Sequence, residues 1–179
     1  MKLLEIGDQA PDFSLIGTDG LIYGMNQYKG YRAIIVMFTS NLSSSARDLD
    51  QYLKNLYLDF HKKGVAFIAI NSANEGDDTY DQMCALMDEH RFPWSYLQDR
   101  TGRIGECYGA STVPEFFLFD HHKSLAYHGR ALDNLKYPEK STREDLKEAL
   151  MELLDLKPIS VQETNPIGTP IKKEELALV

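Results

Sequence analysis

Serine hydroxyls follow the most apolar run of the sequence, and they are the first candidates for chemistry. The run Ala33–Phe38 (AIIVMF) is succeeded by Ser40 and then by Ser43-Ser44-Ser45. A serine attacks as a nucleophile only when a neighbouring base removes its proton, and the sequence shows neither a Gly-x-Ser-x-Gly turn nor evident His and Asp partners. The pattern therefore favours capping of a helix N-terminus by Ser43, Ser44 or Ser45 over hydrolytic catalysis.

Two thiols, Cys84 and Cys107, are the other candidate nucleophiles. They are too few for a structural zinc site or a disulfide scaffold. Each falls inside a predicted helix and not at a helix N-terminus, where a thiol loses its proton more easily. Because free cysteine usually packs as a small apolar group, we expect structural roles for both.

Metal ligation is not expected. Three histidines lie near one another in the sequence: His121, His122 and His128. The first two fall in a predicted turn, and their spacing matches no zinc pattern. Three acidic residues follow the second apolar strand: Glu75, Asp77 and Asp78. They do not fit the spacing of a calcium loop, so we expect a solvated loop, with no cofactor and no metal.

Composition describes one globular domain. The 179 residues are 43% apolar and 26% charged, with a net charge of −8. Such a balance argues against nucleic acid or an anionic membrane as the main partner, because both select for clustered Lys and Arg. No apolar run of about 18 residues and no leading signal segment is evident, which makes the cytoplasm the expected compartment.

Hydrophobic periodicity predicts an α/β order of elements. Buried strands are expected at 33–38 and 65–70, joined by a helix over 45–63 with a capping box at Ser45–Asp48 and an end at Gly64. The remaining predictions are a hairpin of 13–16 with 21–23, a helix over 79–91, a short strand at 96–97, a short helix over 102–108, a hairpin of 115–120 with 125–129, and a helix over 142–156 capped by Ser141 or Thr142. We expect a domain over residues 1–156 and a tail over 157–179.

Two stretches resemble a known family. The opening motif of redoxins, G-x-x-A-P-D-F-x-L, is similar to Gly7-Asp8-Gln9-Ala10-Pro11-Asp12-Phe13-Ser14-Leu15. The second stretch is residues 108–119 (YGASTVPEFFLF), which resemble the redoxin segment that contains a proline before a hairpin strand, here Pro114. The chain thus resembles the alkyl hydroperoxide reductase/thiol-specific antioxidant group of thioredoxin-like proteins over residues 5–156. The resemblance implies a thioredoxin fold: a central mixed sheet flanked by helices, with an N-terminal hairpin.

The resemblance also locates a redox site, and there the sequence departs from it. In thioredoxin-like relatives the segment after the first strand resembles F-x-C-x-x-C-P, whereas here Ser40, Ser43 and Ser44 occupy the two cysteine positions and the proline position. Thr112 and Thr169 stand where some relatives carry further cysteines. A hydroxyl cannot form a disulfide, and a helix dipole cannot turn it into an alkoxide at neutral pH. The resemblance therefore implies a degenerate thiol–disulfide site.

Three hypotheses for function remain. In the family the proline matching Pro114 is cis and exposes the preceding backbone to an extended peptide. The groove would be lined by Ser40, Asn41, Ser43, Thr112, Val113 and Pro114, and it would bind an extended peptide or protein partner, or a small acidic ligand held by backbone N–H groups. Alternatively, Cys107 or Cys84 supports peroxide or disulfide reduction. In the third, the domain serves as a subunit of a homodimer, since some relatives dimerise.

Overall fold

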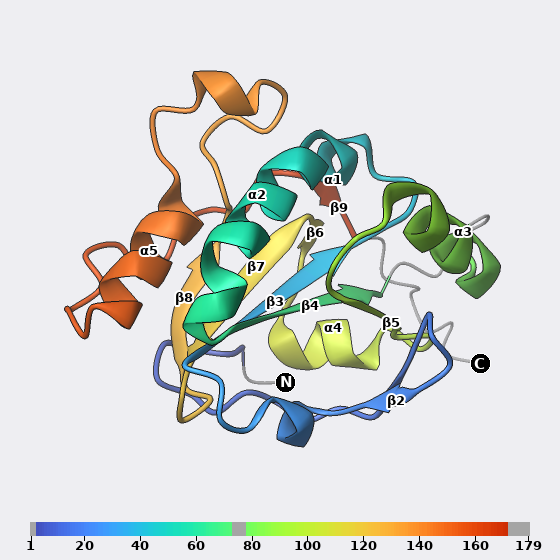
Figure 1. Ribbon diagram of the computed structural model, residues 1–179, viewed down its shortest axis with the longest axis horizontal. Helices are drawn as coiled ribbons and strands as arrows, with labels where there is room; N and C mark the ends of the chain where they lie inside the picture. The colour runs from blue at the N-terminus through green and yellow to red at the C-terminus, as the bar shows by residue number, and fades with distance from the viewer. Residues whose placement is uncertain (1–2, 73–77, 172–179) are drawn as a thin grey trace, which may run out of the picture.

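The computed structural model describes residues 3–72 and 78–171. One sheet runs in the order β2-β1-β5-β4-β3-β7-β8, and a second, two-stranded sheet pairs β6 with β9 (Figure 1). In chain order the elements are β1 (Leu15–Gly17), β2 (Ile22–Tyr23), η1 (Met25–Tyr28), β3 (Ala33–Thr39), α1 (Ser44–Asp48), α2 (Asp50–Phe60), η2 (His61–Lys63), β4 (Val65–Asn71), α3 (Tyr80–His90), β5 (Ser95–Gln98), α4 (Arg103–Tyr108), β6 (Thr112–Val113), β7 (Glu115–Asp120), β8 (Leu125–Gly129), η3 (Pro138–Lys140), α5 (Asp145–Leu154) and β9 (Thr169–Pro170).

The main sheet is mixed, as the sequence predicts. β3 pairs in parallel with β4 and antiparallel with β7, and β4 pairs in parallel with β5. The N-terminal hairpin of β1 and β2 and the hairpin of β7 and β8 are both present. Every residue of β3 and of β4 is buried, which explains why these two strands read as unbroken apolar runs.

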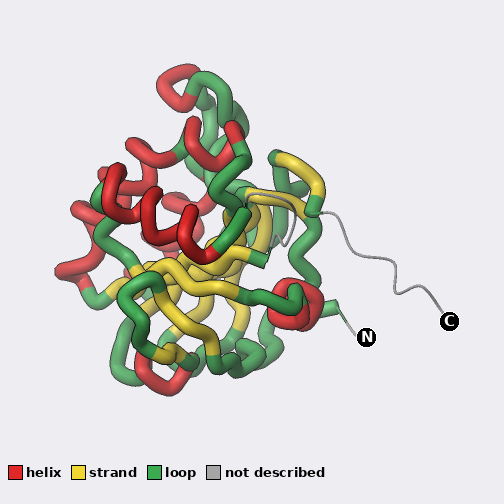
Figure 2. Tube along the Cα trace, turned by 90° about the vertical axis from the view of Figure 1, so that its right-hand side faces the viewer, coloured by secondary structure: helices red, strands yellow, loops and turns green. Residues whose placement is uncertain are grey.

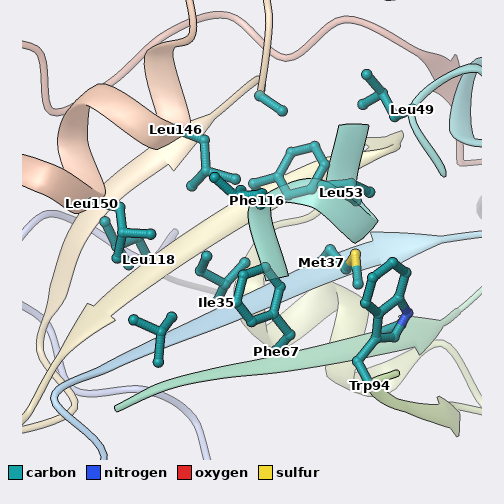
Figure 3. Close-up of a cluster of buried hydrophobic side chains, with 14 of the residues drawn as sticks. Ile35, Met37, Leu49, Leu53, Phe67, Trp94, Phe116, Leu118, Leu146 and Leu150 are labelled. Atoms are coloured by element: carbon teal, nitrogen blue, oxygen red, sulfur yellow. The ribbon is translucent and has the colours of Figure 1, made fainter. Parts of the chain in front are cut away.

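Two apolar layers cover the two faces of this sheet. Alternate strand residues divide between them, so that Ile35 faces α2 and α5 while Val36 faces α4. Figure 2 shows the strands in the middle of the molecule with helices on both sides. In the larger layer, leucines of α2 and α5 converge on strand side chains such as Phe116 and Phe67 (Figure 3). The two layers fix the sheet rigidly beneath the loops at the strand ends.

The predicted helix over 45–63 is wrong in its continuity and in its cap. It is divided at Leu49, whose N–H donates to the carbonyl of Ala46, three residues back, as in a tighter 3₁₀-type turn. The N-cap is Ser43, one of the three serines expected to cap a helix, and its hydroxyl accepts the N–H of Ala46. The predicted capping box that begins at Ser45 is therefore wrong. Gly64 does end this segment, with a left-handed φ of 83°.

The last helix is also shorter than predicted. It begins at Asp145, because the hydroxyls of Ser141 and Thr142 are used elsewhere. Thr142 donates its hydroxyl and its N–H to Asp133, and Ser141 donates to the carbonyl of Asn134. These two residues therefore fasten the loop before α5 and do not cap the helix.

The segment after α5 packs along the domain as far as Ile171. Thr164 donates its N–H to the carbonyl of His128 in β8, and its hydroxyl contacts that of Tyr127 at 2.6 Å. The chain then crosses to β6, where β9 forms the second sheet (Figure 1). Among the described residues, no helix is long and apolar enough to cross a membrane.

Candidate functional site

The ends of β3 and β4 bring the serine segment close to Asn71 and Asp78. Thr39 and Asn71 are paired in register at the carboxyl ends of these parallel strands. Residues 40 and 41, which follow Thr39, contact Asp78 at this edge of the sheet. In open α/β sheets, ligands bind outside the carboxyl ends of the strands.

Ser40 is held by a buried carboxylate. Its side chain is 5% exposed, and its hydroxyl donates to Oδ2 of Asp78 at 2.5 Å while accepting the N–H of Leu42 at 3.2 Å. Asp78 is itself 6% exposed. The expectation of a solvated acidic loop is thus wrong for Asp78, while Glu75 and Asp77 lie outside the described residues.

Asn41 completes the network around this carboxylate. Its N–H donates to Oδ1 of Asp78 at 3.1 Å, and the side-chain amide of Asn71 donates to the same oxygen at 2.7 Å. Tyr96 donates its hydroxyl to Oδ1 of Asn41 at 2.8 Å. Burial, reinforced by the charge of Asp78, raises the pKa of Tyr96 well above its usual range, so this tyrosine stays a neutral donor.

Ser43 joins three parts of the chain. It is 5% exposed, and its hydroxyl oxygen lies 3.2 Å from the N–H nitrogen of Ala46, 3.3 Å from the carbonyl oxygen of Val113 and 3.4 Å from the hydroxyl of Thr169. A serine hydroxyl has one hydrogen and two lone pairs. If Ser43 donates to Val113 and accepts from Ala46 and Thr169, all three are used, and no lone pair remains for a substrate.

The loop before Pro114 is held by Glu115. This side chain is 1% exposed, and its Oε2 accepts the backbone N–H groups of Ser111 at 2.7 Å and Thr112 at 2.9 Å. The Val113–Pro114 peptide bond is cis. Glu115 therefore fixes the backbone that presents the carbonyl of Val113 to Ser43.

The other oxygen of Glu115 meets His128. Oε1 lies 2.5 Å from Nε2 of the histidine, whose ring stacks on Phe117. Burial opposes ionisation of Glu115, but the bonds from His128, Ser111 and Thr112 outweigh it and hold the pKa of this carboxyl below its usual value. His128 is thus part of the support of the site, whereas His121 and His122 lie exposed in the turn where the sequence places them.

Arg47 and Asp50 form a charged pair next to Thr39. Arg47 donates to the hydroxyl of Thr39 at 3.4 Å, and its Nε lies 3.5 Å from Oδ2 of Asp50. Burial raises the pKa of Asp50 although Arg47 and His90 oppose that shift. A cavity of about 20 Å³ adjoins this pair and Pro114, enough for about one water molecule.

The two cysteines lie apart from these residues. Cys84 is in α3, which packs on the layer of α2 and α5, and its thiol contacts the carbonyl of Thr18 at 3.6 Å. Cys107 is in α4, against the opposite layer. Both are free, and neither lies in the first turn of its helix. With the sheet between them, they cannot form a disulfide, which needs Cα atoms within about 7 Å.

The structure thus brings Ser43 and Val113 into contact and places Ser40 and Asn41 on a shared partner. Thr112 and Pro114 flank Val113 in the same loop. The sequence reasoning left three residues that build this site out of it: Asp78, Glu115 and His128. It named Thr169 only as a position where some relatives carry cysteine. For Asp78 a signal existed, since it follows a strand parallel to the one before Ser40. In the described part of the chain, no three His, Cys, Asp or Glu residues gather as metal ligands would.

Comparison with models of protein families identifies the family of this chain. The model of the AhpC/TSA family matches residues 6–128, more than half of the chain. The chain belongs to the AhpC/TSA family. A search of curated proteins gave no match.

Solved structures show the same architecture as this AhpC/TSA protein. An uncharacterized conserved protein from Geobacillus kaustophilus is 28% identical, with a TM-score of 0.88 over 98% of this chain and 96% of its own. A hypothetical protein from Sinorhizobium meliloti 1021 is 27% identical, with a TM-score of 0.86 over 96% of each chain. A putative thiol:disulfide interchange protein DsbE from Chlorobium tepidum, 20% identical, has a TM-score of 0.66 over 86% of this chain and 97% of its own. The expected thioredoxin fold is confirmed.

Proposed function

We propose that this AhpC/TSA-family protein performs no thiol–disulfide chemistry at the β3–α1 junction and instead binds an extended polypeptide segment there. One observation carries the proposal: the backbone of β6, next to Ser43, already forms an antiparallel pair with an extended segment, β9. Strand addition of this kind supplies affinity through main-chain hydrogen bonds and needs no reactive side chain.

The hydroxyls at the junction support the non-redox part of the proposal. Ser40 and Ser43 stand at the two positions where the resemblance places cysteines, and both are committed to structural hydrogen bonds with Asp78, Val113 and Ala46. Neither hydroxyl forms a disulfide or takes up electrons. In this proposal the two serines at the junction have structural roles and are not a reaction centre.

The alternative is thiol chemistry through Cys107 or Cys84. Neither thiol lies at a helix N-terminus, where the macrodipole favours a thiolate, and the sheet separates one from the other. Insulin reduction and peroxide consumption, measured on wild type and on Cys84→Ala with Cys107→Ala, discriminate. Wild-type activity that disappears in the double variant would establish the alternative.

The proposal itself is tested by restoring the thiols. Ser40→Cys with Ser43→Cys should reduce insulin disulfides when dithiothreitol supplies the electrons, while wild type leaves the rate at that of dithiothreitol alone. Ser44→Cys with Ser45→Cys, two thiols in α1 outside the two positions, serves as the control. A wild-type rate equal to that of the restored variant would refute the loss of redox function.

A cytoplasmic location belongs to the same proposal. Both cysteines are free, which is the usual state of thiols in a reducing compartment. Fractionation of cells producing the protein would test it, and recovery from an exported fraction would contradict it.

A further inference from the structure

The backbone edge of β6, the surface that an added strand would pair with and that we call the groove, is occupied by the protein's own chain. Thr169 and Pro170 lie opposite Val113 and Thr112 in antiparallel register, and Ile171 donates its N–H to the carbonyl of Ser111 at 2.9 Å. In Figure 1, β9 lies beside β6 at the N-terminal end of α1. The tail thus takes the position that an added strand would take.

Three positions of the tail, 168, 169 and 171, fit the groove. A Cβ on Gly168 would lie 2.3 Å from the backbone carbonyl oxygen of Val113, so only glycine allows this approach. Thr169 meets the hydroxyl of Ser43, and Ile171 packs on the apolar layer beneath α4. The sequence of residues 168–171 is therefore glycine, a hydroxyl residue, proline and an aliphatic residue.

The tail is fastened just before it enters the groove. Thr164 is bonded to His128, Tyr127 and Arg130, and a Cβ on Gly129 would lie 2.2 Å from its hydroxyl oxygen. Only residues 165–168 then separate this anchor from β9. A short tether of this kind keeps its end at a local concentration on the order of millimolar.

We propose that the tail segment 168–171 is an intramolecular ligand that closes the groove and is also the template for what the groove accepts. The external partner is an extended polypeptide segment with glycine, a hydroxyl residue, proline and an aliphatic residue in that order. It binds when the tail is lifted, because the same backbone edge of β6 serves both. This inference rests on the proposed function, whose binding site it regulates.

A hollow on the surface continues from the edge of β6. It has a volume of about 750 Å³, and its lining includes Gly168, Ser44 of α1 and Tyr137 of the loop before α5. The segment preceding the glycine of an external partner would run through this hollow.

The test is a titration of the full chain with a peptide of residues 165–171 (NPIGTPI), followed by the amide signals of Ser111, Thr112 and Val113. Gly168→Ala expels the tail without altering the groove, and we expect it to bind the peptide at least about tenfold more tightly than wild type, whose own tail competes. The peptide with alanine in place of glycine should bind neither protein. Equal binding by wild type and Gly168→Ala, or equal binding of the two peptides, would overturn the proposal.

A matched pair of variants guards against misfolding of Gly168→Ala. Ile171→Ser removes the apolar contact of the tail, whereas Ile167→Ser alters an exposed tail residue that does not pair with β6. Peptide binding should improve in the first and not in the second; improvement in both or in neither contradicts the proposal. A concentration-dependent dimer of wild type in sedimentation that Gly168→Ala abolishes would show tails exchanged between two copies and would refute an intramolecular ligand. Insulin reduction by wild type would refute the non-redox function and would not bear on the tail, which the peptide titration tests separately.

Discussion

The hydroxyl groups of Ser43 and Thr169 lie 3.4 Å apart, although 126 residues separate them in the sequence. Ser43 begins α1 and Thr169 belongs to β9, so this contact joins the helix N-terminus to the tail across the carbonyl of Val113. Both residues stand at positions where the resemblance places cysteines in some relatives. An experiment that detects this contact therefore tests the position of the tail.

Ser43→Cys with Thr169→Cys should form an intramolecular disulfide under mild oxidation, because the two side-chain tips already face each other. Closing a loop of this length stabilises a protein by up to about 4–5 kcal/mol. Peptide mapping by mass spectrometry locates the bond. Ser44→Cys with Thr169→Cys is the control, since Ser44 is exposed. A tail that does not lie at Ser43 would give no bond in either pair.

Ser40 and Asp78 should be energetically coupled. Ser40→Ala leaves a buried carboxylate without one of its donors, which costs about 1–3 kcal/mol in the free energy of unfolding. Asp78→Asn alone should cost a similar amount, and a double-mutant cycle by urea denaturation should give a coupling of about 0.5–3 kcal/mol. The exposed Ser44→Ala should stay within about 0.5 kcal/mol of wild type. Additive effects of the first two substitutions would contradict the bond between them.

The support of the Pro114 loop should depend on pH through Glu115. Its pKa in the folded state is lowered from the value of about 4.3 in an unfolded chain, so its stabilisation is complete above that pH and is lost as the pH falls through the folded-state pKa. Glu115→Gln should cost about 2 kcal/mol at pH 7, and the difference from wild type should shrink below about pH 4.

Urea denaturation across pH 3–8 measures this difference. The exposed Glu139→Gln is the control and should stay within about 0.5 kcal/mol of wild type. A gap between wild type and Glu115→Gln that is constant down to pH 3 would exclude an ionised Glu115 as the source of the stabilisation.

Gly129 should be needed for the tail to pack. Gly129→Ala and Gly7→Ala both place alanine at a positive φ, 140° and 91°, but only at Gly129 would the Cβ meet another segment, at 2.2 Å from Thr164. Gly129→Ala should therefore destabilise the protein by about 1–3 kcal/mol more than Gly7→Ala. Hydrogen exchange at Thr164 and Ile171 should also be faster in Gly129→Ala alone. Equal exchange in both variants would show that the tail does not depend on this contact.

Much of the fold could be predicted from the sequence because the signals are local. Fully buried strands read as the apolar runs of β3 and β4, and Gly64 marks a helix end through its left-handed backbone. The breaks were less predictable. The late start of α5 depends on where the hydroxyl of Thr142 finds a partner, and Asp133 becomes that partner only after the loop before α5 has folded.

For the site, the sequence alone determined the chemistry that is present: hydroxyls at Ser40, Ser43, Thr112 and Thr169, and thiols only at Cys84 and Cys107. Residue type fixes what an atom can donate, accept or oxidise, whatever the surroundings. Tertiary structure alone decided which groups meet. In the folded protein Asp78 contacts Ser40, Glu115 accepts the N–H of Thr112 in the loop before Pro114, and Thr169 contacts Ser43. The sequence does not reveal these contacts, because they form only when the sheet and the tail have packed.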